Sequence, residues 1–541
     1  MQATMQRVPL NMCSFFDRAG KMFGSVEIVS RMPDKSLHRT TYGAFHRRAR
    51  LLAEALQKAG VQKGDRVATL MWNHYAHFEA YFGIIAAGAV LHTLNLRLAP
   101  DEIGWIANHA EDTVIVVDDV LLPLFEQFRA ATKIRKVIVV SLTGKPVPAG
   151  YDEYEAFLAT ATGRWDYPPM DEDDPIAMCY TSGTTGRPKG VVYSHRSQVL
   201  HTLAQCLPDS IGLSGRDVLL PVVPMFHANA WGVPYAAVML GMKLVFPGPH
   251  LHPDDLLPLL RDERVTVSCG VPTIWLGMVQ VLDQAGVGAW KLHPELKLTV
   301  GGSAVPESLI RGFARHGIDV LQGWGMTETS PLCTISKLLH TQGEVSEDEM
   351  FATKASQGYT VPLVDIRIMG DEGEQPWDGK SVGEIQVCGP WITGAYHDLP
   401  ASQHSFTADG WLRTGDVAAI TPEGFVKITD RTKDLIKSGG EWISSVDLEN
   451  AIMGHPAVAE AAVIAVPHPK WAERPLAVVV FKQGQRATQA ELQQFLAARM
   501  VKWMVPDAFA FVESIPRTST GKFQKTKLRE MYPTWDWQEA S

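Results

Sequence analysis

Strand-like and helix-like segments alternate along much of the chain. Residues 41–60 repeat apolar positions at intervals of three and four and end in glycine, which indicates a helix, and residues 65–72 then have the apolar pattern of a strand. Further strand-like runs occupy residues 89–95, 113–118, 136–141, 265–269 and 297–300. This alternation predicts an α/β architecture.

The character of the sequence changes after residue 360, where short strands separated by Gly and Asp turns indicate a β-rich subdomain. Residues 430–444 are polar and charged, and the rest of the chain follows a pattern of helix, strand, strand and helix at residues 447–453, 461–466, 476–482 and 489–500. Since 541 residues exceed one compact unit, we place a boundary near Asp430. We expect a large domain of α/β sheets, residues 1–429, and a small α+β domain, residues 430–541.

The bulk properties exclude several classes of protein. The formal net charge of −9, without a dense run of Lys or Arg, gives no surface for nucleic acid. The six cysteines are scattered without a C-x-x-C pair, so we expect no disulfide framework and a reducing, cytoplasmic compartment. The longest apolar runs, such as residues 84–90, are too short to cross a bilayer, and the N-terminus has no signal-peptide pattern.

A loop suited to polyphosphate follows the strand-like residues 176–180. It combines hydroxyls, glycines and a lysine: Thr181, Ser182, Gly183, Thr184, Thr185, Gly186 and Lys189. Glycines let backbone N–H groups surround an anion, hydroxyls add donors, and the lysine adds a cation.

Two other interpretations of this loop are disfavoured. A Walker A loop needs glycine where this chain has Pro188, and Ser or Thr where it has Gly190, so that motif is excluded. A flexible surface loop of small polar residues would not place the lysine, the proline and the strand-like GVVYS so regularly.

The segment YTSGTTGRPKG, residues 180–190, closely resembles the adenylate-forming (AMP-binding) superfamily of acyl-CoA synthetases, peptide-synthetase adenylation domains and firefly-type luciferases. Further motifs of that superfamily follow in the same order. The resemblance implies an acid–thiol ligase that uses ATP and CoA as co-substrates and Mg²⁺ as cofactor. It would convert a carboxylic acid to acyl-AMP and pyrophosphate, and then to acyl-CoA and AMP.

Residues 322–328, QGWGMTE, resemble the family segment that binds the nucleotide. The resemblance implies that Trp324 packs near adenine, that Thr327 contacts the α-phosphate and that Glu328 binds Mg²⁺, with Thr184 as a second metal contact. Mg²⁺ commonly takes one or two oxygen ligands from protein while it bridges phosphates, which agrees with this assignment. The expected nucleotide contacts also include Gln322, Gly323 and Gly325.

Three more residues complete the implied adenylation site. Asp416, in a T-G-D motif, would accept from the ribose hydroxyls, and Arg431 would reach the ribose or phosphate. Lys522, in a P-x-x-x-x-G-K motif, would enter the site and stabilise the charge that gathers as the acid attacks the α-phosphorus. With Thr184 and Glu328, Lys522 forms the predicted catalytic set.

A glycine loop is expected to act in the second half-reaction. Lys437, Gly439, Gly440, Glu441 and Trp442 resemble the segment that lets the pantetheine arm of CoA pass close to backbone. The resemblance implies a mobile small domain that rotates near Asp430, presenting first Lys522 and then this loop.

The acyl group is expected beside His227, Trp231, Gly301 and Gly302, where glycines leave room and the tryptophan can line a tunnel. For Trp231, a helix start packed on the core is an equally good interpretation. Three segments, residues 389–396, 438–456 and 467–480, resemble the bacterial medium- and long-chain fatty-acyl branch, which also includes enzymes for methylthiopropanoate. A short-chain or thioether acid is therefore the alternative substrate.

Other functions stay open at this point. A chain of this kind could load a carrier protein or act as a luciferase-like oxygenase, although it contains no attached carrier domain. A non-catalytic binding protein with the same fold is a further alternative. Resemblance to relatives also implies a homodimer, with the N-terminal 35 or so residues as its arm.

Overall fold

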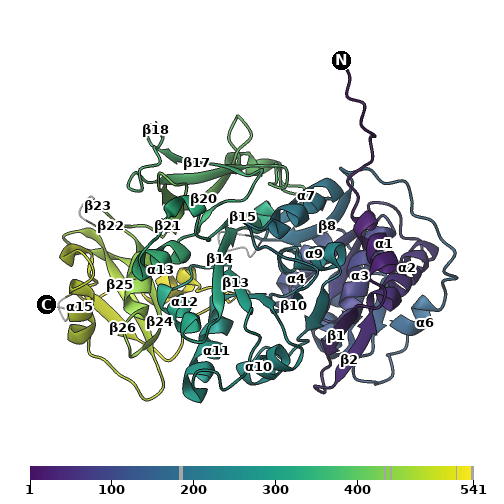
Figure 1. Ribbon diagram of the computed structural model, residues 1–541, viewed down its shortest axis with the longest axis horizontal. Helices are drawn as coiled ribbons and strands as arrows, with labels where there is room; N and C mark the ends of the chain where they lie inside the picture. Colours follow the sequence, from purple (N-terminus) through teal and green to yellow (C-terminus); the bar gives the residue numbers. More distant parts are fainter. Residues whose placement is uncertain (182–186, 432–433, 439–440, 519–520, 538–541) are drawn as a thin grey trace.

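The computed structural model describes residues 1–181, 187–431, 434–438, 441–518 and 521–537, and only the backbone of residues 400, 401, 403, 441 and 442. The first part of the chain forms two large sheets with helices around them (Figure 1). The expected α/β architecture is confirmed. Among the described residues, no helix is both long and apolar enough to span a membrane.

The first sheet has seven strands in the order β7-β6-β5-β3-β4-β8-β9. Its members are β3 (Arg66–Leu70), β4 (Val90–Thr93), β5 (Val114–Asp118), β6 (Lys136–Val140), β7 (Asp152–Glu153), β8 (Pro175–Tyr180) and β9 (Gly190–Ser194). All neighbours are parallel except β8 and β9. In the sequence, the predicted phosphate loop lies between these two antiparallel strands.

The second sheet has nine strands in the order β16-β15-β14-β13-β12-β10-β11-β1-β2. They are β1 (Glu27–Arg31), β2 (Leu37–Thr41), β10 (Val218–Pro221), β11 (Lys243–Phe246), β12 (Val267–Gly270), β13 (Lys297–Gly301), β14 (Asp319–Gly325), β15 (Leu332–Ile335) and β16 (Tyr359–Thr360). The central strands are parallel and are buried on both faces. Every strand expected before residue 300 is present.

Helices lie between the two sheets and on the outer face of each, so that the helices and sheets form five layers. Phe45 of α2, Phe78 of α3 and Tyr235 of α9 belong to the core between the sheets. Trp275 of α11 packs on the outer face of the nine-stranded sheet, and Phe125 of α5 on that of the seven-stranded sheet. The helices and short 3-10 turns of this region are α1 (Met12–Met22), α2 (Tyr42–Lys58), α3 (Tyr75–Ala86), α4 (Pro100–His109), η1 (Asp119–Leu121), α5 (Leu122–Arg129), α6 (Tyr154–Leu158), α7 (His195–Cys206), α8 (Ala228–Trp231), α9 (Val233–Leu240), α10 (Pro253–Asp262), α11 (Pro272–Ala285), α12 (Glu307–Arg315), η2 (Thr327–Thr329), η3 (His340–Gln342) and α13 (Glu347–Ala355).

The predicted β-rich subdomain is a five-stranded antiparallel sheet in the order β18-β17-β19-β20-β21. It consists of β17 (Asp365–Gly370), β18 (Gly373–Glu374), β19 (Gly383–Cys388), β20 (Leu412–Ile420) and β21 (Val426–Arg431), with η4 (Pro400–Ser405) between β19 and β20. Figure 1 shows β20 and β21 between the large sheets and the C-terminal part.

The C-terminal part has its own sheet and core. The expected helix, strand, strand and helix are present as α14 (Ser445–Met453), β24 (Val458–His468), β25 (Ala472–Phe481) and α15 (Gln489–Ala497). The sequence did not predict β22 (Ile436–Ser438), β23 (Glu441–Ile443), η5 (Lys502–Met504), β26 (Ala508–Phe511) or α16 (Lys525–Met531). These elements are too short for their periodicity to be recognised. Residues 436–438 and 441–443, part of the polar and charged segment at residues 430–444, extend the small sheet as β22 and β23.

Candidate active site

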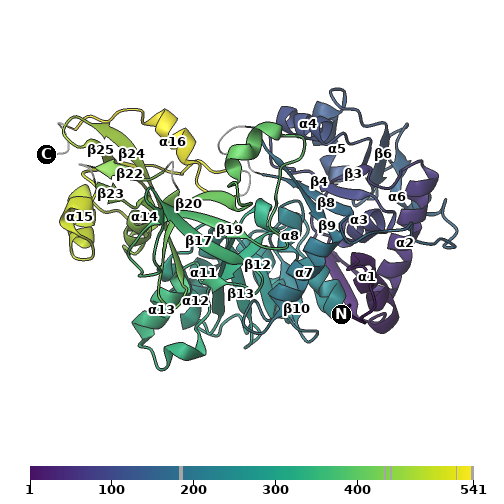
Figure 2. The same cartoon turned by 90° about the horizontal axis from the view of Figure 1, so that it is seen from above.

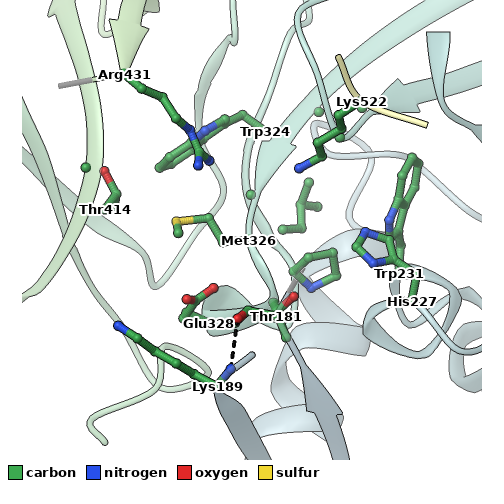
Figure 3. A pocket seen from close by; sticks show the side chains of 18 of the residues that line it. Thr181, Lys189, His227, Trp231, Trp324, Met326, Glu328, Thr414, Arg431 and Lys522 are labelled. Carbon is green, nitrogen blue, oxygen red and sulfur yellow. Dashed lines mark hydrogen bonds between the residues drawn. The ribbon is translucent and has the colours of Figure 1, made fainter. Parts of the chain in front are cut away.

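A cavity of about 560 Å³ lies where the large sheets, the five-stranded sheet and the C-terminal part meet (Figure 3). The carboxyl ends of β8, β13 and β14 open toward it, as ligand sites of α/β sheets commonly do. Thirteen predicted site residues line it: Thr181, Lys189, His227, Trp231, Gly301, Gly302, Gly323, Trp324, Gly325, Thr327, Glu328, Arg431 and Lys522. Residues more than 300 positions apart in the sequence thus line the same cavity.

A second cavity, of about 970 Å³, adjoins the first and lies against the C-terminal part. The two share Gly302, Gly323, Trp324, Gly325, Arg431 and Lys522. Predicted residues Gln322 and Asp416 line only the second cavity. Lys522 therefore stands at the junction of the two cavities.

The structure does not test every predicted contact. Ser182, Gly183, Thr184, Thr185, Gly186, Gly439 and Gly440 lie outside the described residues, as do the side chains of Glu441 and Trp442. Lys437 lies on β22, where its backbone N–H donates to Glu473 Oε2 at 2.9 Å, and it lines neither cavity. Of the expected CoA contacts, Lys437 is thus described with its side chain, and it is not at either cavity.

One buried carboxylate joins the predicted ribose and adenine contacts. Asp416, which is 4% exposed, accepts a hydrogen bond from Trp324 Nε1 at 3.0 Å. Its other oxygen lies 2.8 Å from Arg431 Nε. The negative charge of Asp416 raises the pKa of Arg431, so the guanidinium is charged. This arrangement fixes the tryptophan ring and the arginine relative to each other.

Glu328 lies on η2, directly after β14, and is buried. Its Oε1 accepts a hydrogen bond from the hydroxyl of Tyr396 at 2.7 Å. The neighbouring Thr327 carbonyl accepts from the Tyr193 hydroxyl at 2.7 Å. A carboxylate offers about four acceptor positions, so one hydrogen bond leaves capacity for a hard cation. A single carboxylate facing a phosphate site suits Mg²⁺ that bridges phosphates.

The ammonium of Lys522 points into the cavity beside Gly302 (Figure 3). A Cβ atom on Gly302 would lie 3.8 Å from Lys522 Cε, and Gly302 has φ +86°, which favours glycine. Burial and the positive charge of Arg431 lower the pKa of Lys522 to about 8, although Asp416 and Glu328 oppose the shift. The lysine is thus a cation near neutral pH that sits close to its titration range.

Trp231 is held by an uncommon turn of backbone. Residues 228–231 all have positive φ, between 42° and 57°, so α8 is a left-handed turn rather than the start of a right-handed helix. The right-handed helix α9 starts only at Val233. The turn aims the indole at the glycine pair: a Cβ on Gly301 would lie 3.7 Å from Trp231 Cη2, and one on Gly302 3.9 Å from Cζ2. Trp231 packs against the core, as the alternative interpretation expects, but it does not start a right-handed helix.

His227 immediately precedes this turn and lines the cavity. Burial, with the charges of Lys522 and Arg97, lowers the pKa of His227 to about 3. Its imidazole is neutral at physiological pH. The side of the cavity expected to hold the acyl group thus presents an indole, a neutral imidazole and glycine backbone.

The sequence interpretation missed several residues that line the cavity, among them Arg187, Met326, Tyr396, Arg413 and Thr414. Arg187 lies inside the quoted loop motif and its guanidinium stacks over Trp105 at 5.1 Å. Tyr396 comes from the connection between β19 and β20, and the centre of its ring lies 4.6 Å from Lys189 Nζ. It ends the segment GPWITGAY, which was noted only for its resemblance to the fatty-acyl branch, so its place beside Lys189 became evident only from the fold.

Comparison with known families agrees with this geometry. The family described as AMP-binding enzyme matches residues 16–397, and the AMP-binding enzyme C-terminal domain matches residues 447–522. The chain belongs to the AMP-binding enzyme family. The match to residues 16–397 contains the phosphate loop, Glu328 and Tyr396, and the second match ends at Lys522.

Members of this family with curated names resemble the chain over its full length. A long-chain-fatty-acid–CoA ligase of Thermus thermophilus is 51% identical, covering 98% of this chain and 97% of the relative. A 3-methylmercaptopropionyl-CoA ligase of Ruegeria pomeroyi is 42% identical, covering 98% and 99%. A medium-chain-fatty-acid–CoA ligase of Ectopseudomonas oleovorans is also 42% identical, covering 98% of each chain. All three are CoA ligases of carboxylic acids.

Proposed function

We propose that the protein is an AMP-forming acyl-CoA synthetase that activates a medium- or long-chain fatty acid. The observation that carries this proposal is the position of Lys522, which extends from the C-terminal part into a cavity that also holds Glu328 and Trp231. A cation, a candidate metal ligand and an apolar acyl side thereby converge at one point. The names of the three relatives point to the same reaction class.

In the first half-reaction, a carboxylate oxygen of the acid attacks the α-phosphorus of ATP, and the bond to pyrophosphate breaks. Negative charge then grows on the α-phosphate and on the acid oxygens. The ammonium of Lys522 stabilises that charge without giving up its proton. Asp416 and Arg431 hold the ribose, and Trp324 packs against the adenine.

Glu328, together with Thr184, is the proposed site for Mg²⁺. When bound there, the ion would neutralise phosphate charge and orient the leaving pyrophosphate. Tyr396 positions the Glu328 carboxylate by its hydrogen bond at 2.7 Å. Lys189 and the hydroxyls of the phosphate loop bind the remaining phosphate oxygens.

In the second half-reaction, the thiol of CoA attacks the acyl carbonyl, the thiol proton leaves and AMP departs. We propose that the small domain, residues 430–541, rotates about a hinge near Asp430 between the steps, because Lys437 lies away from the cavity in the present arrangement. The rotation would withdraw Lys522 and bring Lys437, Gly439, Gly440, Glu441 and Trp442 toward the pantetheine arm. Closure around the adenylate would also keep water from the mixed anhydride.

The preference for a fatty acid rests on the acyl side of the cavity. Trp231 and the glycine pair offer apolar contact, and the neutral His227 offers no charge to a polar acid. Ile211, Pro331 and Leu332 also line the cavity. A short thioether acid is the second candidate, because the relative from Ruegeria pomeroyi is as similar as the medium-chain ligase.

An acid panel tests the function. Acids from methylthiopropanoate to long-chain fatty acids are offered with ATP and Mg²⁺, and pyrophosphate and AMP are measured with and without CoA. We expect CoA-dependent AMP release that is highest for medium or long chains. Maximal turnover of methylthiopropanoate would favour the second candidate. CoA-independent light emission or carrier loading, or no pyrophosphate with any acid, would contradict the proposal.

Two properties outside the reaction are also proposed. We assign the protein to the cytoplasm, since its six cysteines are all free. We assign it a homodimeric state, with the extended and exposed N-terminal residues as an arm. Light scattering of the full chain and of a chain lacking residues 1–9 tests the dimer, which the shorter chain should not form.

A further inference from the structure

A buried ion cluster lies three residues beyond the lysine of the cavity. Lys525, the first residue of α16, has its ammonium 2.7 Å from Glu449 Oε1, and it donates to Ser445 Oγ at 2.5 Å. Glu449 and Ser445 both belong to α14 and are buried. Lys525 therefore fastens the start of α16 to the first turns of α14.

The same end of α14 contacts the large domain. The backbone N–H of Ser445 donates to Asp430 Oδ2 at 2.8 Å, and the hydroxyl of Ser444 donates to the carbonyl of Thr429. Asp430, near the end of β21, is 1% exposed. Burial would lower the pKa of Lys525, but the carboxylates of Glu449 and Asp430 outweigh it and raise that pKa. The lysine is thus a cation between carboxylates from two parts of the protein.

The segment that carries Lys522 lies between this cluster and a second ion pair. Two backbone hydrogen bonds join the two sides of this segment. Thr518 N–H donates to the Lys522 carbonyl at 2.8 Å, and Gln524 N–H donates to the Pro516 carbonyl at 2.8 Å. One end is tied within the small domain, where Arg517 Nη2 lies 2.5 Å from Glu460 Oε1. The other end is Lys525. Figure 2 shows α16 on the side of the C-terminal part that faces the large domain.

We propose that Lys525 is a positioning residue for adenylation, which holds the Lys522 loop against Asp430 only while the small domain is docked as in this structure. This inference rests on the proposed function. Asp430 lies at the proposed hinge, on β21 of the five-stranded sheet. Rotation of the residues that follow the hinge separates Asp430 from Ser445 and Lys525, whereas Glu449 keeps its contact with Lys525 because both rotate together. Lys525 therefore contributes to the first half-reaction and not to the second.

The test compares both half-reactions in Lys525→Met and in Lys527→Met. Lys527 is exposed on the same helix, so this control loses an equal charge without touching the cluster. Adenylation is measured as pyrophosphate release, and thioester formation from synthetic acyl-AMP and CoA. For Lys525→Met we expect adenylation to fall about 10- to 100-fold, because the reacting lysine is displaced. Thioester formation should change less than about twofold, and Lys527→Met should behave as wild type in both steps.

Two further variants make the outcome decisive. Lys525→Arg, which keeps the charge, should recover part of the adenylation rate. Asp430→Asn, which alters only the β21 side of the contact, should reduce adenylation selectively, and it decides the matter if Lys525→Met does not fold. Equal loss of both half-reactions, or unchanged adenylation, would overturn the inference. Failure of the wild type to form any acyl-adenylate would refute the proposed function and this inference together.

Discussion

Arg431 Nε lies 2.8 Å from Asp416 Oδ1, while the second oxygen of the same carboxylate accepts from the Trp324 indole. The carboxylate thereby joins the end of β21 to the end of β14. Because one carboxylate orients both side chains, loss of its charge would disturb the proposed ribose and adenine contacts together.

Replacement of Asp416 by Asn removes the charge that compensates Arg431. We expect the KM for ATP in pyrophosphate release to rise about 10- to 100-fold, since a buried charged pair loses one member. Asp409→Asn is the control, because Asp409 pairs with Arg367 at the exposed surface. Equal KM values for both variants would exclude Asp416 from nucleotide binding.

Removal of the Tyr396 hydroxyl tests the proposed metal site. In Tyr396→Phe the Glu328 carboxylate loses its orienting hydrogen bond, so the Mg²⁺ concentration for half-maximal adenylation should rise about tenfold. Tyr532→Phe, in the C-terminal part, should leave it unchanged. Metal titrations after chelator treatment measure the effect, and identical titration curves for Tyr396→Phe and wild type would speak against Glu328 as a metal ligand.

The pH dependence follows from Lys522, whose pKa is lowered to about 8. The ammonium is the active form, so kcat/KM for ATP in adenylation should be constant below this pKa and fall as the pH rises through it. Lys522→Arg should lose this alkaline limb, because guanidinium stays charged. Adenylation that is flat between about pH 7 and 10 would contradict the assignment.

Replacement of Gly301 by Ala tests the close approach of β13 and β14 at the cavity. A Cβ at this position would lie 2.6 Å from the carbonyl oxygen of Gly323, and backbone cannot yield as a side chain can. Gly301→Ala should therefore disturb the β13–β14 edge and lower adenylation at least about tenfold. Gly277→Ala on α11 meets only Pro253 Cγ at 3.4 Å, so activity should be retained. Fluorescence-monitored melting separates loss of activity from loss of fold.

Much of the architecture could be predicted, because long parallel strands such as residues 114–118 are buried on both faces and read as continuous apolar runs. The short strands β22 and β23 could not be predicted, since three residues are too few to show a regular alternation of apolar and polar side chains. In the site, the sequence predicted residues that lie inside contiguous motifs, such as Glu328 and Lys522, and both of these line the cavity. The division at Asp430 stays a prediction.

Residues whose role depends on distant segments were not predicted. Tyr396 reaches Glu328 across 68 positions of sequence, and Lys525 meets Ser445 across 80. The left-handed turn at residues 228–231 was also missed, because its alanines, asparagine and tryptophan give no local signal for positive φ. Such features arise from tertiary packing, which overrides local preference.

The most direct test of the account is Lys522→Ala, assayed separately for the two half-reactions, with Lys527→Ala as control. The account predicts that pyrophosphate release from acid and ATP falls at least about 100-fold, because the cation at the α-phosphate is lost. Thioester formation from supplied acyl-AMP and CoA should stay near the wild-type rate. Equal loss of both steps, or adenylation at the wild-type rate, would contradict the role of Lys522.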